Sequence, residues 1–242
     1  MYAIDIQGLS KQYGKTLAVD HLSLQVPEGE LLSLLGVNGA GKTTTVKMLS
    51  CLTRPTEGDA YLLGKSIRRD TAAVKSLIAV SPQETAVAPG LTVIENLALM
   101  CGVHGLSKEK QTRKIRELTA QLGLETVLYK KAGKLSGGWQ RRLSIAMALV
   151  SEPRILFLDE PTLGLDVLAR AELWKIISAL KGKVTVILTT HYMEEAEALS
   201  DRVAIMKDGR LLVCDTPQNI KRAAQTENFE QAFIRVVQEV SV

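Results

Sequence analysis

The sequence has 242 residues, enough for one large domain or for one domain with a sub-domain. Hydrophobic residues make up 46 % of it and charged residues 23 %, which is the balance of an ordinary globular protein. The net charge of +4 is too small to argue for nucleic-acid binding, although it would not oppose a position beside an anionic membrane surface.

Two segments near the start of the chain predict strands. Residues 2–9 alternate weakly between apolar and polar side chains, and residues 19–26 alternate clearly, with the apolar ones mostly on one side. We therefore expect a small antiparallel sheet here. Tyr13 lies at its edge, where a packing role is the better interpretation from composition alone. Stacking on an adenine ring, which contributes about 1–3 kcal/mol per base, is the alternative.

Residues 36–43 (Gly-Val-Asn-Gly-Ala-Gly-Lys-Thr) fit the phosphate-binding pattern G-x-x-x-x-G-K-[ST] at every fixed position. The glycines let backbone N–H groups approach a polyphosphate, which a side chain would block. Lys42 would place a cation on the terminal phosphates, and the Thr43 hydroxyl would bind Mg²⁺. The predicted nucleotide contacts in this stretch are Gly36, Asn38, Gly39, Ala40, Gly41, Lys42, Thr43 and Thr44.

The segments on either side agree with this interpretation. Residues 31–35 predict a buried strand leading into the loop, and residues 44–52 predict a helix whose positive end faces the phosphates. A glycine-rich turn that binds nothing would not require this order of strand, loop, Lys-Thr and helix. A dinucleotide-binding fingerprint fits less well because its glycines are spaced differently.

Beyond the loop, the sequence predicts a strand at 59–63, a helix at about 70–76 and a strand at 77–80. Gln83 follows in a loop, where its amide offers both an acceptor and donors.

Residues 84–133 change in character. Residues 92–95 form a capping box that opens a helix, and residues 108–122 predict a strongly charged amphipathic helix. We expect an all-helical sub-domain inserted into an α/β core. Its lysines and arginines are interleaved with glutamates, which favours a solvated helix face over a nucleic-acid patch.

Ser136, Gly137 and Gly138 precede a helix that we expect to run to about Leu149. Read alone, this stretch is by default a simple helix cap. It could equally present N–H groups and a hydroxyl to an anion.

Residues 155–160 predict a fully buried parallel strand that ends in two carboxylates. Ligands of open α/β sheets bind at this end of the strands. Asp159 therefore suits a Mg²⁺ partner, and Glu160 suits orienting or deprotonating a water molecule. Two acids that merely end a strand are the alternative, which Lys42 upstream disfavours.

The rest of the chain continues the α/β pattern. A turn at 161–166 leads into a helix at 167–180, with Asp166 as its N-cap, and then into a strand at 183–189. His191 follows that strand, where a phosphate contact competes with a structural role. A hairpin spans residues 203–213, and the tail from 216 to 242 predicts short helices.

The three cysteines are far apart and odd in number, which indicates a reduced, cytosolic protein. We expect no signal peptide, and no apolar run approaches the roughly 18 residues that cross a bilayer. If the protein serves a membrane, another chain must span it.

Taken together, these motifs resemble the ATP-binding subunit of an ABC transporter over about residues 2–220. The most specific part of the resemblance is the ordered set of residues 36–43, 135–138 and 155–160. It implies an α/β fold: a P-loop NTPase core with a mainly parallel sheet, an N-terminal antiparallel β sub-domain and a helical sub-domain at about 84–150. Residues 221–242 would form a short helical tail.

The resemblance also implies roles for single residues. Residues 36–43 would be the Walker A motif, Asp159 would close the Walker B motif, and residues 135–138 are similar to the signature motif. Tyr13 would stack on adenine, Gln83 would be the Q-loop glutamine and a Mg²⁺ contact with Thr43 and Asp159, and His191 would be the switch histidine. The family usually has Gln where this chain has Trp139, and often Ser where it has Leu163 in the D-loop (163–166).

A head-to-tail homodimer that holds two ATP molecules with Mg²⁺ is implied as well. Each site would combine Lys42, Thr43, Gln83, Asp159, Glu160 and His191 of one copy with Ser136, Gly137 and Gly138 of the other. A separate integral membrane permease would be the partner, at the cytoplasmic face of the cell membrane, with no role for nucleic acid. Residues 139–143, 189–197 and the Phe229/Phe233 tail look like the subgroup that serves drug, ion or lipid exporters.

Two functions of other classes remain as alternatives. One is a soluble ABC-type ATPase in a non-transport assembly. The other is a non-catalytic nucleotide binder, which Glu160 and His191 disfavour.

Overall fold

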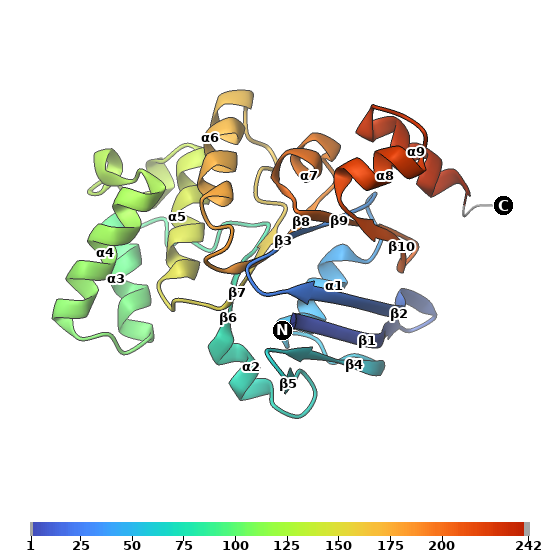
Figure 1. The fold of residues 1–242 in the computed structure, drawn as a ribbon. Coiled ribbons are helices and arrows are strands. Elements are labelled where there is room, and N and C mark those ends of the chain that lie inside the picture. The colour runs from blue at the N-terminus through green and yellow to red at the C-terminus, as the bar shows by residue number, and fades with distance from the viewer. Residues whose placement is uncertain (1, 240–242) are drawn as a thin grey trace.

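The computed structural model describes residues 2–239, and two sheets organise them (Figure 1). The strands are β1 (Tyr2–Tyr13), β2 (Thr16–Pro27), β3 (Leu31–Leu35), β4 (Glu57–Leu62), β5 (Lys65–Ser66), β6 (Ile78–Ser81), β7 (Ile155–Asp159), β8 (Thr185–Thr190), β9 (Arg202–Lys207) and β10 (Arg210–Asp215). The α-helices are α1 (Lys42–Leu49), α2 (Thr71–Leu77), α3 (Val93–Val103), α4 (Lys108–Leu122), α5 (Gly137–Leu149), α6 (Val167–Ser178), α7 (Met193–Leu199), α8 (Pro217–Ala223) and α9 (Phe229–Glu239), with 3₁₀ turns at Glu125–Val127 and Ala132–Lys134.

The larger sheet has the strand order β10-β9-β3-β8-β7-β6. All its neighbours pair in parallel except β9 and β10, which form the predicted hairpin. Every residue of β3, β7 and β8 is buried, as a parallel sheet covered on both faces requires. The predicted, mainly parallel core is therefore confirmed. Its consequence for the site is that the carboxyl ends of β3, β7 and β8 meet at one edge.

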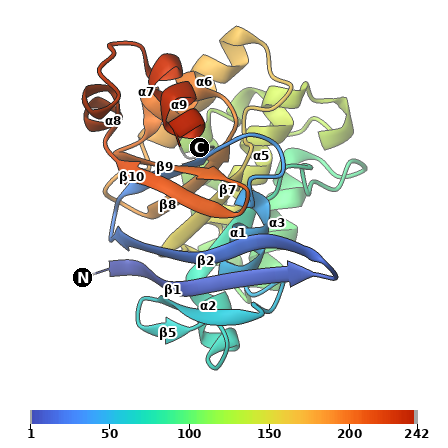
Figure 2. The same cartoon turned by 90° about the vertical axis from the view of Figure 1, so that its right-hand side faces the viewer.

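The smaller sheet is antiparallel and has the order β2-β1-β4-β5. Only its first two strands lie in the region where the sequence placed the sheet. β4 and β5 come after the phosphate loop in the chain; β4 pairs with β1 and β5 pairs with β4, an arrangement that no local pattern encodes. Figure 2 shows β1 and β2 below the β9–β10 hairpin, and α1 packs its apolar face between the two sheets.

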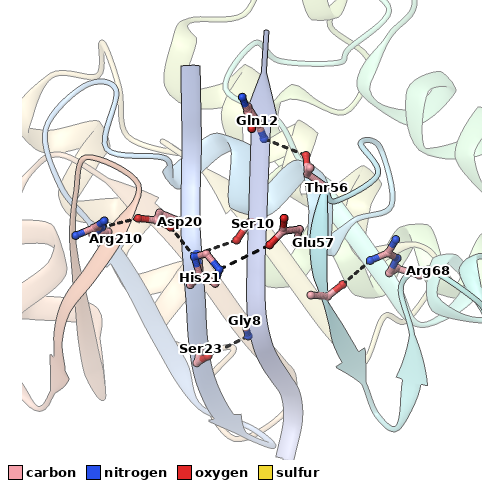
Figure 3. A network of polar contacts seen from close by, with 11 residues as sticks. Gly8, Ser10, Gln12, Asp20, His21, Ser23, Thr56, Glu57, Arg68 and Arg210 are labelled. Atoms are coloured by element: carbon pink, nitrogen blue, oxygen red, sulfur yellow. Dashed lines mark hydrogen bonds and ion pairs between the residues drawn. The ribbon is translucent and has the colours of Figure 1, made fainter. Parts of the chain in front are cut away.

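Two irregular points explain why the alternation in β1 and β2 is imperfect. Gly8 and His21 have left-handed φ angles of 58° and 49°, and the pairing of the two strands shifts register around them. Hydroxyl groups satisfy the displaced backbone donors: Ser23 accepts from the N–H of Gly8, and Ser10 accepts from that of His21 (Figure 3). The shift keeps the apolar side chains of both halves on the buried face.

Helices α3, α4 and α5 stand beside the larger sheet, on its β6 side (Figure 1). The capping box is confirmed, because Thr92 and Glu95 exchange hydrogen bonds at the start of α3, and α4 has the predicted bounds. Side chains of these helices share one apolar cluster with β7 and β8. The helices are therefore packed onto the core, and their status as a separate sub-domain stays a prediction.

Some boundaries differ from the prediction. Helix α1 begins at Lys42 and ends at Leu49, three residues early, because Cys51 takes a left-handed φ of 56° that a helix cannot continue. Helix α6 ends at Ser178 and not at residue 180. In the tail, α8 packs on β9 and β10 through Ile220, and α9 does so through Phe229 and Phe233. Residues 240–242 of the predicted tail lie outside the described residues.

Candidate functional site

The stretch predicted to bind phosphate joins the end of β3 to the start of α1 and forms the floor of a pocket of about 450 Å³. The pocket lies at the carboxyl edge of the parallel sheet, where α/β proteins bind ligands. It is lined by Asn38, Gly39, Ala40, Gly41, Lys42, Thr43, Thr44, Gln83, Glu160, Leu163 and His191. Residues more than a hundred positions apart in the sequence thus face one space.

Two glycines of the loop are required by close packing. A Cβ on Gly36 would lie 2.4 Å from the carbonyl oxygen of Met206, and one on Gly41 would lie 2.6 Å from that of Ala18. Gly41 also has a φ of 99°, which L side chains rarely adopt. The loop is therefore held tightly against β2 and β9.

Lys42 is almost fully buried, with 5 % of its surface exposed. Its Nζ donates hydrogen bonds to the carbonyl oxygens of Gly36 (2.7 Å) and Val37 (3.1 Å). Burial lowers the pKa of Lys42, while the carboxylates of Glu160 and Asp159 act in the opposite direction. The cation thus has two neutral acceptors in its own loop, and a phosphate oxygen would be a stronger partner because it is charged.

Asp159 ends β7 and is 7 % exposed. Its Oδ1 accepts a hydrogen bond from the hydroxyl of Thr43 at 3.3 Å and another from the hydroxyl of Thr189, its register partner on β8. A carboxylate and a hydroxyl side by side are hard oxygen donors, the kind that Mg²⁺ prefers. The side chains present therefore fit a Mg²⁺ ion, which Thr43 and Asp159 would hold, and Gln83 lines the same pocket as Thr43.

Glu160 directly follows β7 and is turned by a left-handed φ of 46°. Its N–H is held by both the carbonyl oxygen (3.1 Å) and the hydroxyl (3.0 Å) of Thr189. The carboxylate Oε1 lies 3.2 Å from Nδ1 of His191. Such a conformation in a non-glycine residue is costly, by about 1–3 kcal/mol, and is found mostly at functional sites. It aims the carboxylate into the pocket beside the imidazole.

Six of the predicted site residues do not line this pocket: Tyr13, Gly36, Ser136, Gly137, Gly138 and Asp159. Tyr13, at the end of β1, is 47 % exposed, with the Lys11 ammonium 4.9 Å from its ring centroid. Ser136, Gly137 and Gly138 lie at the start of α5. Ser136 is the N-cap residue of α5, but its hydroxyl makes no capping hydrogen bond.

Sequence reasoning missed two residues that support the site. Thr189 holds both Asp159 and Glu160, and its signal was available, since it is a polar residue next to the end of a buried strand. Arg141 donates to the carbonyl oxygens of Pro82 and Gln83 from a helix far along the chain. Nothing local in the sequence marks that contact.

Comparison with known proteins agrees with this geometry. Residues 19–163 match the family model described as ABC transporter. The Doxorubicin resistance ATP-binding protein DrrA of Mycobacterium tuberculosis is 40 % identical over 225 residues, which cover 92 % of this chain and 68 % of that protein. The probable multidrug ABC transporter ATP-binding protein YbhF of Escherichia coli is 38 % identical over 97 % of this chain. The chain spans only 41 % of the length of YbhF.

A solved structure shares the fold as well. It is described as the dimeric structure of a post-hydrolysis state of the ATP-binding cassette MJ0796 bound to ADP and Pi. It superposes with a TM-score of 0.78 and 27 % identity, covering 88 % of this chain and 98 % of the other. The α/β fold, with its parallel-rich sheet and its antiparallel sheet, is that of an ABC-type P-loop NTPase.

Among residues 2–239, no helix combines the length and the apolar character needed to cross a membrane.

Proposed function

This chain belongs to the ABC transporter family, and on that premise we propose that it is the subunit that binds and hydrolyses ATP to power a membrane transporter. One observation carries the proposal: Lys42, Gln83, Glu160 and His191, which come from four separate parts of the chain, line one pocket over the phosphate-binding loop.

Each side chain suits a step of phosphoryl transfer to water. Lys42 would exchange its loop carbonyl partners for oxygens of the terminal phosphates, and the loop N–H groups would bind the remaining ones. Glu160 would orient the attacking water and accept its proton. His191, 3.2 Å from that carboxylate, would hold Glu160 and contact the terminal phosphate. Thr43, Asp159 and Gln83 would hold Mg²⁺, which supplies positive charge to the phosphate oxygens when bound.

We propose that two copies pair head to tail and that Ser136, Gly137 and Gly138 of one copy complete the site of the other. Two observations support this arrangement. The Ser136 hydroxyl makes no capping hydrogen bond to its own helix, and Ser136 does not line the pocket of its own chain. Tyr13 would stack on the adenine ring. ATP would then bind the closed dimer more tightly than the open one, and only such differential affinity can drive closure. Hydrolysis of ATP would remove this preference for the closed dimer.

The partner is proposed to be a separate integral membrane permease, with this chain on the cytoplasmic face of the membrane. Export is the proposed direction, since the related DrrA and YbhF are named for drug resistance and multidrug transport. A soluble ABC-type ATPase in a non-transport assembly is the competing function.

Affinity purification separates the two. The tagged Glu160→Gln protein would be recovered with Mg·ATP from membranes of cells that carry it, and its partners identified by mass spectrometry. An integral membrane protein that is absent from a parallel Lys42→Ala purification supports the transporter. Recovery from the soluble fraction alone, with soluble partners, favours the competing function.

A further inference from the structure

Helix α5, which begins at the proposed signature residues, also holds the turn that carries Gln83. Arg141, one turn into the helix, has only 5 % of its surface exposed. Its two terminal guanidinium nitrogens donate to adjacent carbonyl oxygens, Nη1 to Pro82 at 2.7 Å and Nη2 to Gln83 at 2.6 Å. Burial lowers the pKa of Arg141 and the nearby Asp159 carboxylate raises it. The buried Arg141 guanidinium thus fixes two consecutive peptide units beside the site.

The neighbouring residues of α5 strengthen the connection. Gln140 donates to the carbonyl oxygens of Ala132 (3.1 Å) and Leu135 (3.2 Å), in the segment that leads into Ser136. Ser144, on the same helix face as Arg141, hydrogen-bonds Ser81 at 3.0 Å, at the end of the strand before Gln83. One stretch of helix therefore holds both segments at once. A rigid shift of α5 would move the Ser136 loop and the Gln83 turn together.

We propose that Arg141 is a positioning residue that couples the Ser136–Gly138 loop to Gln83 of the same chain. The inference rests on the proposed function, in which that loop contacts the nucleotide of a partner copy. Contact with the partner's nucleotide would shift α5, and Arg141 would carry the shift to Gln83 in its own pocket. Each of the two ATP sites would then respond to whether the other is filled.

The geometry of the side chain matters more than its charge. A guanidinium is a planar fork that donates to two acceptors in a fixed arrangement, whereas an ammonium is a point charge on a flexible stem. Lys at this position keeps the cation near Asp159 but loses the fork. Arg141→Lys is therefore the informative variant, because it leaves no buried carboxylate without a counter-charge.

The test is a double-mutant cycle on the full chain. Turnover of Mg·ATP would be measured, with single-turnover conditions for slow variants, for wild type, Arg141→Lys, Gln83→Ala and the double variant. We expect Arg141→Lys to lower kcat about tenfold, the scale of one charge-assisted hydrogen bond, with KM for ATP little changed. In the Gln83→Ala background the same substitution should change kcat by less than about twofold, because its effect passes through Gln83. The Hill coefficient for ATP should fall toward one.

Arg142→Lys is the matched control. Arg142 is the next residue of α5, but it pairs with Glu172 and lies over the Trp139 ring, with its guanidinium carbon 4.6 Å from the ring centroid. Any decrease in kcat that Arg142→Lys causes should be the same in the wild-type and Gln83→Ala backgrounds. Thermal unfolding of all variants would expose a general loss of stability.

Two results would overturn the inference alone: a wild-type kcat for Arg141→Lys, or an equal loss in both backgrounds. A wild-type chain that turns over no ATP, with a Glu160→Gln variant that does not dimerise on adding ATP, would instead overturn the proposed function together with the inference.

Discussion

The Nδ1 atom of His191 lies 3.2 Å from the Oε1 atom of Glu160, although 31 residues separate them in the sequence. Each follows a buried parallel strand, and β7 and β8 are neighbours in the sheet. The strand pairing therefore brings a carboxylate and an imidazole together above the phosphate-binding loop. This pair gives the first prediction.

Glu160→Gln should keep ATP binding but lower turnover by about 10²- to 10⁴-fold, the usual contribution of a general base. The amide has nearly the same shape as the carboxylate but cannot accept a proton from water. Phosphate release and nucleotide binding would be measured side by side. Glu109→Gln, an exposed change on α4, is the control and should behave as wild type. Near-normal turnover would remove Glu160 from this role.

Lys42→Ala should weaken ATP binding or kcat/KM by at least about tenfold, because it removes a charge-assisted contact to phosphate. Lys47→Ala, on the same helix but exposed, is the matched control. Equilibrium binding of a fluorescent ATP analogue and steady-state turnover would measure both effects. An unchanged kcat/KM would contradict the assignment of the phosphate loop.

Removal of Mg²⁺ with a chelator should abolish turnover, and Thr43→Val should raise the Mg²⁺ concentration needed for half-maximal turnover. The reason is that the Thr43 hydroxyl lies 3.3 Å from the Asp159 carboxylate, and these two oxygen groups are the proposed ligands of Mg²⁺. A titration of turnover against Mg²⁺ at fixed ATP measures the shift. If the titration curves of the variant and the wild type coincide, Thr43 is not a ligand.

Gly41→Ala and Gly64→Ala separate conformational strain from close packing. Both glycines have left-handed φ angles, 99° and 79°, so both substitutions should cost about 1–2 kcal/mol of unfolding free energy. Only Gly41 has a backbone atom in the way, the Ala18 oxygen at 2.6 Å, while nothing lies within 4 Å of a Cβ on Gly64. We expect urea unfolding to show a further loss of about 1–3 kcal/mol for Gly41→Ala. Equal losses of unfolding free energy for the two variants would mean that the loop moves away from the Ala18 oxygen at no energetic cost.

The buried Glu195 predicts a pH dependence of the protein's stability. It is fully buried, and its Oε1 accepts a hydrogen bond from Trp174 at 3.1 Å. Burial raises the pKa of Glu195 in the folded protein above its ordinary value of 4.5. The folded state then binds more protons than the unfolded state, so this residue's contribution to stability is present below pH 4.5 and is lost as pH rises through the folded pKa.

Glu195→Gln should remove that loss, because the neutral amide still accepts from Trp174. Its melting temperature relative to wild type should be higher at alkaline than at acidic pH. Glu109→Gln again serves as the control, with a difference that does not change with pH. A pH-independent difference for Glu195→Gln would contradict the assignment.

The sequence alone predicted the local features well. Residues 36–43, the capping box at Thr92, the bounds of α4 and the buried strand before Asp159 each depend on chain neighbours, which a pattern records directly. The same patterns marked the side chains that line the pocket. Where a local choice was ambiguous, as for the end of α1, the prediction was wrong, since helix ends depend on the backbone angles of one or two residues.

Only the tertiary structure decided which of these features meet. Three contacts join segments that are distant along the chain: the pairing of β4 with β1, the hydrogen bond between Thr43 and Asp159 across 116 positions, and the contact of Arg141 with Gln83 across 58 positions. Such contacts depend on strand order and on the packing of α5 against the sheet. A local sequence pattern reports the preferences of neighbouring residues, whereas strand order is set by how the whole chain buries its apolar faces.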